Sequence, residues 1–241
     1  MATVTVGPRA NEQLQRFGRE WRQGEHVLIT GPTGSGKTTL ARHVVQRRLD
    51  RGGHVVVFVG KLGQDKTITS EYAGWERWKT WQRRRPSEWQ SRILLWPDTS
   101  RMSIPQARAH QRLVFADAMD RLSRTGKWTV QIDEGLYTCD PSMLNLSGPL
   151  GMLSNMGRSA NLTTVVLAQR PANLPLVLYS NASHVFAGRA RELSDQKRLS
   201  ELGGRESSKE LIRSLSQLGR RDFMWIPVAP DWPSEPVNLR T

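Results

Sequence analysis

The possible folds of this chain are narrowed first by a glycine-rich stretch, Gly31-Pro32-Thr33-Gly34-Ser35-Gly36-Lys37-Thr38. It follows an apolar run, Val27-Leu28-Ile29-Thr30, and precedes a helical pattern from Thr39 to Leu49. The stretch fills every fixed position of G-x-x-x-x-G-K-[ST], a motif that functions where a strand passes into a helix. The sequence therefore predicts a phosphate-binding loop in an α/β fold.

Each position of this loop has a chemical reason. The glycines let backbone N–H groups turn inward around a β-phosphate, and the helix N-terminus adds its positive dipole end. Lys37 is predicted to reach the β- and γ-phosphate oxygens, and the Thr38 hydroxyl to ligate Mg²⁺. The cofactors expected are ATP and Mg²⁺. The predicted nucleotide-binding residues are Gly31, Pro32, Thr33, Gly34, Ser35, Gly36, Lys37, Thr38 and Thr39.

A second motif is a short β-branched run that ends in two acids, Lys127-Trp128-Thr129-Val130-Gln131-Ile132-Asp133-Glu134. This is the Walker B pattern, in which Asp133 would hold Mg²⁺ and Glu134 would polarise the attacking water. Kinases rarely need the second acid. The pair therefore favours ATP hydrolysis coupled to motion over phosphoryl transfer to a small molecule.

A third apolar run, Leu162 to Ala168, ends in Gln169-Arg170-Pro171. An amide at the tip of a strand beside a phosphate loop can hydrogen-bond the γ-phosphate or the lytic water. Gln169 is the candidate for this role, and an ordinary polar residue at a strand end is the alternative.

The order of four segments, GPTGSGKT, VQIDE, GRSANLTTVVLAQRP and NASHVFAGRARELSDQKRLSELGG, resembles the FtsK-HerA superfamily of DNA-pumping ATPases. The resemblance covers roughly Val27 to Gly204. It implies a RecA-like, three-layer αβα fold with a mainly parallel sheet and an added strand between the Walker A and Walker B strands. It also implies a homo-oligomeric ring, expected to be a hexamer, that acts on double-stranded DNA.

In this superfamily an arginine of one subunit completes the ATP site of its neighbour. Arg158, in Met156-Gly157-Arg158, falls at the matching place. Arg170, Arg189 and Arg191 are rivals for this role, and a solvated cation at a helix end is the simpler reading of Arg158.

The length of 241 residues points to one subgroup of this superfamily, because it leaves no room for an added membrane, winged-helix or nuclease domain. The chain is most similar in this respect to the minimal genome-packaging ATPases of membrane-containing, tectivirus-like viruses. Residues 1–241 are expected to form a single ATPase domain, with a core at about 22–204 and a helix, strand and Pro-rich tail at 205–241. No apolar run approaches the roughly 20 residues that a transmembrane helix needs.

The charge balance favours a polyanionic partner. Lysine and arginine number 35 against 22 acids, a formal charge of +13, and they are spread along the chain. A lone cysteine, Cys139, suits a reducing compartment, and no histidine has zinc-ligand spacing with another His or Cys. The expected location is the host cytoplasm or the packaging vertex of a virion, with capsid vertex proteins as further partners; for a cellular protein it is the cytoplasm.

A segment from Tyr72 to Trp96 alternates tryptophan with arginine and lysine. Aromatic rings interleaved with cations suit nucleic acid, through base stacking and phosphate contacts. Trp75, Trp78 and Trp81 also fit the buried face of an amphipathic helix, and a subunit interface is a third reading. The sequence leaves these three open.

Apolar periodicity outlines the remaining elements. Helices are expected at Asn11–Trp21, Thr38–Leu49, Pro105–Leu122 and from Gly204 to Leu218, and strands at Val27–Thr30, His54–Val59, Ile93–Trp96 and Phe223–Ile226. Strands that alternate with helices form a parallel sheet, whose ligands bind at the carboxyl ends of the strands.

The motifs and the charge together predict an ATP-driven double-stranded DNA translocase, of the viral genome-packaging kind. A conjugation or filamentous-phage assembly ATPase, or a helicase loader, shares the same chemistry. A nucleotide-dependent DNA-binding switch and a small-molecule kinase are the alternatives from other classes.

Overall fold

A computed structural model describes residues 8–82, 92–201, 208–228 and 237–240 of the chain. Within these ranges nine strands form one sheet in the order β3-β4-β2-β5-β6-β1-β7-β8-β9. The strands are β1 (His26–Thr30), β2 (His54–Phe58), β3 (Glu76–Trp78), β4 (Arg92–Leu95), β5 (Trp128–Ile132), β6 (Thr163–Ala168), β7 (Ala182–Gly188), β8 (Asp222–Pro227) and β9 (Val237–Arg240). Strands β1 to β7 run parallel, and β8 and β9 are antiparallel to their neighbours.

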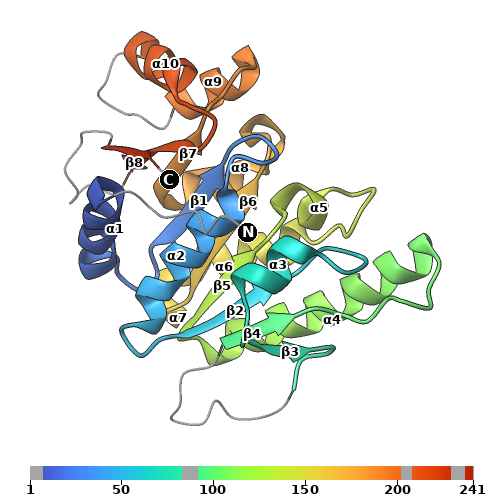
Figure 1. Cartoon of the computed structure of the whole chain (residues 1–241). Coiled ribbons are helices and arrows are strands. Elements are labelled where there is room, and N and C mark those ends of the chain that lie inside the picture. The colour runs from blue at the N-terminus through green and yellow to red at the C-terminus, as the bar shows by residue number, and fades with distance from the viewer. Residues whose placement is uncertain (1–7, 83–91, 202–207, 229–236, 241) are drawn as a thin grey trace.

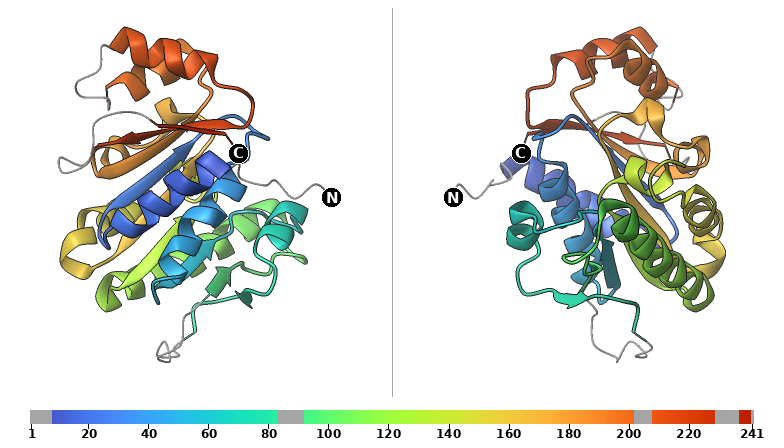
Figure 2. Two further views of the ribbon diagram at one scale, coloured as in Figure 1. Left: turned by 60° about the vertical axis from the view of Figure 1, so that its left-hand side comes forward. Right: turned by 90° about the vertical axis from the view of Figure 1, so that its right-hand side faces the viewer.

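Helices cover both faces of the sheet, so the described residues form three layers (Figures 1 and 2). The helices are α1 (Pro8–Glu20), α2 (Lys37–Leu49), α3 (Lys66–Glu71), α4 (Ile104–Thr125), α5 (Gly135–Cys139), α6 (Ser147–Asn155), α7 (Gly157–Ala160), α8 (Leu176–Ser180), α9 (Leu193–Ser200) and α10 (Ser208–Gln217), with a 3-10 turn at Pro171–Asn173. This architecture confirms the predicted RecA-like α/β fold.

Two hydrophobic cores lie on opposite faces of the sheet because side chains alternate along each strand. In β1, Val27 and Ile29 pack with Phe17 of α1 and Val44 of α2. Leu28 points the other way, into the core that α4, α6 and α8 cover. All five residues of β1 are buried, as expected for a central parallel strand covered on both sides.

The added strand of the RecA-like type is β6. It pairs with β1, which precedes the phosphate loop, on one side and with β5, which carries the Walker B acids, on the other. The carboxyl ends of β1, β5 and β6 therefore lie next to one another at one edge of the sheet.

Three strands were absent from the sequence-based outline: β3, β7 and β9. The residues of β7 had been quoted only as part of a longer motif, although they form a fully paired strand between β1 and β8. After the strand Phe223–Ile226, the outline expected only a Pro-rich tail, with no further strand. That expectation is wrong for Val237–Arg240, which pair with β8 as an edge strand.

The helical reading of Trp75, Trp78 and Trp81 is wrong as to secondary structure, because α3 ends at Glu71 and Trp78 belongs to β3. Burial of the first two is nevertheless correct: Trp75 and Trp78 are 8% and 5% exposed, in the cores on opposite faces of the sheet. Trp81 packs edge-on against Trp78 and Trp128. The buried rings of Trp75 and Trp78 are not available to stack on nucleic-acid bases. Trp89 and the arginines at positions 83–85 lie outside the described residues.

None of the helices within the described ranges combines the length and the apolarity that crossing a bilayer requires.

Candidate functional site

The phosphate loop connects β1 to α2 at the carboxyl edge of the sheet. Gly34 and Gly36 have φ angles of 76° and 94°, in the left-handed region that glycine adopts without strain. Helix α2 begins at Lys37, so its free N–H groups and its dipole face the loop. Lys37 Nζ lies across the loop and donates hydrogen bonds to the carbonyl oxygens of Gly31 (2.7 Å) and Pro32 (3.0 Å).

The two Walker B acids and Gln169 extend from neighbouring strand ends. Asp133 and Glu134 follow β5, and Gln169 follows β6. Gln169 links two parts of the site, because its Oε1 accepts a hydrogen bond from Thr33 Oγ1 (2.9 Å) and its Nε2 donates one to Glu134 Oε2 (3.0 Å). A single amide thus connects the phosphate loop to the carboxylate predicted to orient water.

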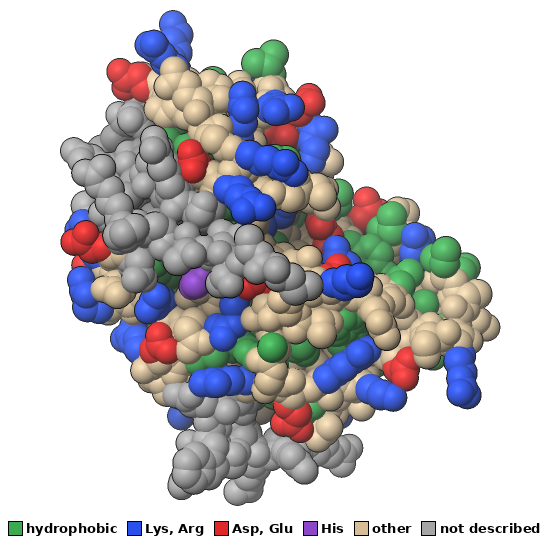
Figure 3. Space-filling model, in the orientation of Figure 1, with side chains coloured by type: hydrophobic (Ala, Val, Ile, Leu, Met, Phe, Trp, Pro, Cys, Tyr) green, Lys and Arg blue, Asp and Glu red, His purple; other side chains and the backbone are tan. Residues whose placement is uncertain are grey.

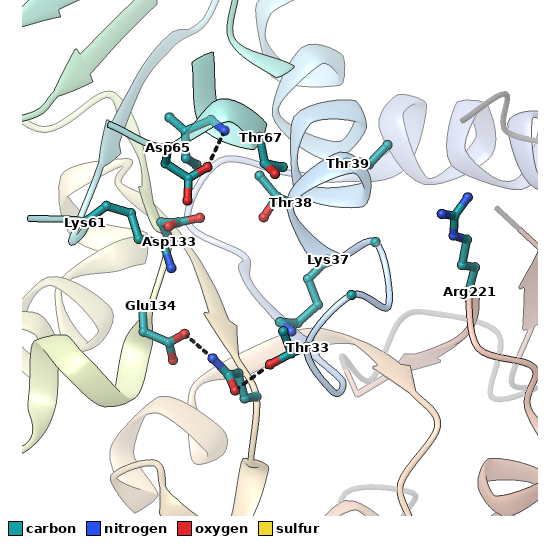
Figure 4. Close-up of a pocket in the computed structure, with 14 residues that line it drawn as sticks. Thr33, Lys37, Thr38, Thr39, Lys61, Asp65, Thr67, Asp133, Glu134 and Arg221 are labelled. Atoms are coloured by element: carbon teal, nitrogen blue, oxygen red, sulfur yellow. Dashed lines mark hydrogen bonds between the residues drawn. The ribbon is translucent and has the colours of Figure 1, made fainter. Parts of the chain in front are cut away.

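These groups line one cavity of about 310 Å³, drawn in Figure 4. The predicted residues on its wall are Thr33, Gly34, Gly36, Lys37, Thr38, Thr39, Asp133, Glu134 and Gln169. Gly31 and Pro32 line a neighbouring cavity, and Ser35 is buried beneath the loop. The fold therefore brings together all of the predicted nucleotide-site residues except Arg158.

Electrostatics in this cavity are those of a partly desolvated site. Burial raises the pKa of Asp133 to about 6; the nearby Lys61 opposes this shift, and Glu134 adds to it. Burial likewise lowers the pKa of Lys37, against the attraction of Glu134 and Asp133. Acids and bases whose pKa values are shifted by burial and by charged neighbours in a cleft are typical of functional sites.

The donor set fits Mg²⁺. The Thr38 hydroxyl and the Asp133 carboxylate are hard oxygen donors on the wall of the same cavity. Mg²⁺ is usually held by one or two carboxylates together with substrate phosphates, rather than by a cage made of protein alone. The described residues contain no cluster of three or more His, Cys, Asp or Glu that could hold a metal ion.

Five residues of the cavity wall were not predicted: Lys61, Asp65, Thr67, Ile68 and Arg221. The first four follow β2, whose carboxyl end adjoins that of β5. Asp65 caps α3 by accepting a hydrogen bond from the N–H of Ile68 (2.9 Å). For these four residues, the signal in the sequence was their position just after a strand of a parallel sheet, where ligand-binding residues gather.

A second cavity, of about 320 Å³, shares Thr33 and Gln169 with the first. Arg170, Arg189 and Arg191 lie on its wall, and Arg170 pairs with the buried Asp195 (3.1 Å). Gln169 therefore separates the predicted nucleotide site from an arginine-rich cavity on the other side.

Arg158 lies at the amino ends of the strands, whereas the phosphate loop lies at their carboxyl ends. Arg158 is exposed on α7, beside the amino ends of β1, β6 and β7, and lines a third cavity with His26 and Ser183. The residue before it, Gly157, has no room for a side chain, because a Cβ there would lie 2.2 Å from Nε2 of His26. Arg158 thus does not belong to the nucleotide site of its own chain.

The fold and the phosphate loop together define a P-loop NTPase. The sequence model of the CobW/HypB/UreG nucleotide-binding domain matches residues 25–76, which include the loop. No curated protein matches the chain.

Several solved structures are similar to this chain over most of its length. The DNA-packaging ATPase B204 from Sulfolobus Turreted Icosahedral Virus is similar with a TM-score of 0.60 at 16% identity, over 91% of this chain and 98% of that chain. VirB4 of Thermoanaerobacter pseudethanolicus has a TM-score of 0.62 at 10% identity, over 89% of this chain and 88% of that one. B204 from Sulfolobus turreted icosahedral virus 2, in complex with ATP-gammaS, has a TM-score of 0.58 at 15% identity, over 90% and 96%. At these identities the likeness establishes the fold, as the sequence motifs predicted.

Proposed function

We propose that this protein is an ATP hydrolase that translocates double-stranded DNA, in the manner of a viral genome-packaging ATPase. The observation that carries the proposal is the hydrogen-bonded chain Thr33–Gln169–Glu134 inside the phosphate-loop cavity. Through this chain Gln169, which would contact the γ-phosphate, is hydrogen-bonded to Glu134, which would orient the water.

The residues divide the chemistry between them. Lys37 and the loop N–H groups would bind the phosphates, and Thr38 and Asp133 would hold Mg²⁺, which neutralises charge on the phosphate oxygens. Glu134 would position the water for in-line attack. Loss of the γ-phosphate would change the contacts of Gln169, which also forms a wall of the arginine-rich cavity.

DNA is proposed as the polyanion because of the charge and its distribution. The formal charge of +13 is spread along the sequence, and Figure 3 shows lysine and arginine side chains over much of the visible face. A sequence-independent grip on phosphates needs many dispersed cations. The B204 structures, described as genome-packaging enzymes, have this fold over nearly their whole length.

In the proposed working form, copies of the chain assemble into a ring, expected to be a hexamer, and Arg158 of one subunit completes the site of the next. The position of Arg158 at the amino ends of the strands is compatible with a role toward a neighbour. A ring at a capsid vertex, together with vertex proteins, is the viral version of this proposal.

A second candidate is an ATPase of conjugation or secretion, whose partner is a protein. The likeness to the conjugation coupling protein TcpA of pCW3 favours it, at a TM-score of 0.52 and 15% identity over 90% of this chain and 60% of that chain.

The test is the ATPase rate of the full chain with and without double-stranded DNA of mixed sequence. We expect stimulation by DNA, and a DNA affinity that falls with salt at a log–log slope of about −0.9 per phosphate contacted. Glu134→Gln is the matched control, since it should bind ATP but lose hydrolysis about 100-fold or more. Hydrolysis that DNA of any length leaves unchanged would favour the protein-partner candidate, and no hydrolysis at all would refute both.

A further inference from the structure

The turn between α10 and β8 brings two arginines to the phosphate loop from the far end of the sequence. Strand β8 runs antiparallel to β7, with Phe223 opposite Gly188, so β8 begins at the edge where β7 ends. Asp222 holds the turn by accepting a hydrogen bond from the N–H of Gly219 (3.1 Å). Arg220 and Arg221 therefore lie at the nucleotide edge of the sheet.

Both arginines border the loop. A Cβ on Gly34 would lie 3.2 Å from a guanidinium nitrogen of Arg220. Arg221 forms part of the wall of the 310 Å³ cavity itself.

The position of Arg221 shows which end of a nucleotide it would meet. In Figure 4 it lies beyond the phosphate loop, on the side away from Asp133 and Glu134. The acids and Lys37 mark the γ-phosphate end of the site, so the base and ribose extend toward the opposite end. Among the described residues of the cavity wall there is no aromatic ring, and the planar group at that end is the Arg221 guanidinium.

We propose that Arg221 stacks its guanidinium plane on the base of the bound nucleotide and so recognises its nucleoside end. This proposal rests on the nucleotide binding proposed above. Guanidinium groups stack on aromatic faces, whereas a lysine ammonium provides charge without a plane. The contact would also connect nucleotide occupancy to α10, because Arg221 lies in the short turn that joins α10 to β8.

The experiment is calorimetric titration of the full chain with ATP, ADP and inorganic tripolyphosphate. Arg221→Ala and Arg221→Lys should each weaken ATP and ADP about 10-fold and leave tripolyphosphate unchanged, since only the base contact is lost. Arg213→Ala, an exposed arginine on α10, is the matched control and should bind all three as the parent does.

Three results would overturn the assignment. If Arg221→Ala binds ATP as tightly as the parent, Arg221 makes no contact with the nucleotide. If Arg221→Ala loses as much affinity for tripolyphosphate as for ATP, the contact is with the phosphates instead. If Arg221→Lys keeps the parent's affinity for ATP, the charge of the side chain matters rather than its plane. A parent protein that binds no nucleotide would refute the ATPase proposal as well. Absence of DNA stimulation with ATP binding intact would refute only DNA translocation.

Discussion

Replacing His26 with asparagine is expected to flatten the pH dependence of stability between pH 6.5 and 4. His26 is 6% exposed at the start of β1, between α7 and β6. The backbone N–H of Thr164 donates a hydrogen bond to its Nδ1 (3.0 Å), so this nitrogen must keep its lone pair. A second proton on the ring would face a donor in a buried site.

The size of the effect follows from the pKa. Burial lowers the pKa of His26 from 6.5 to about 4; a hydrogen bond to the backbone of Ser154 opposes the shift, and the charge of Arg158 adds to it. The folded state therefore binds this proton more weakly than the unfolded chain. Stability from the neutral ring is complete above pH 6.5 and is lost as pH falls to 4, by about 3 kcal/mol at about 1.4 kcal/mol per pKa unit.

The assay is urea unfolding of parent and His26→Asn at several pH values from 7.5 to 4, followed by circular dichroism. The asparagine amide oxygen is placed to accept the Thr164 N–H and does not titrate. The variant should lose less stability than the parent on acidification, by about 3 kcal/mol at pH 4. His184, whose pKa burial also lowers, is common to both proteins and cancels in the difference. Parallel stability curves for the two proteins would refute this account of His26.

The remaining predictions concern Trp78, in the segment from Tyr72 to Trp96, and Arg158, the arginine proposed to act on a neighbouring subunit. Trp78→Ala should lower the free energy of unfolding by about 3–5 kcal/mol, because it opens a cavity under β3 and β4. The DNA affinity of the folded protein should stay at the parent value. An unchanged melting temperature with weakened DNA binding would contradict the core role of Trp78. If Arg158 serves the neighbouring subunit as proposed, Arg158→Ala should reduce turnover by roughly 10³ to 10⁵, the range for arginines supplied in trans, with little change in ATP affinity. Mixing Arg158→Ala with Glu134→Gln protein should restore part of the activity, since some interfaces then pair an intact Glu134 with an intact Arg158. If rings that exchange subunits stay inactive, the trans role would pass to Arg170, Arg189 or Arg191.

The local sequence was sufficient to predict the nucleotide cavity. The phosphate loop, the acids Asp133 and Glu134, and Gln169 each follow a short apolar strand, and parallel strands deliver their carboxyl ends to one edge. Proximity of these groups therefore follows from local patterns together with the handedness and direction of the connections, without knowledge of any side-chain contact.

Tertiary structure decided what depends on pairing between distant segments. The antiparallel course of β8 brings Arg221 to the phosphate loop, and pairing with β8 makes Val237–Arg240 a strand instead of part of a Pro-rich tail. Burial of Trp75 and Trp78 on opposite faces of the sheet also depends on neighbours far along the chain, because their spacing fits a helix as well as a strand. Local periodicity carries no information on strand order. That order is set by which apolar faces bury one another once the whole chain is packed.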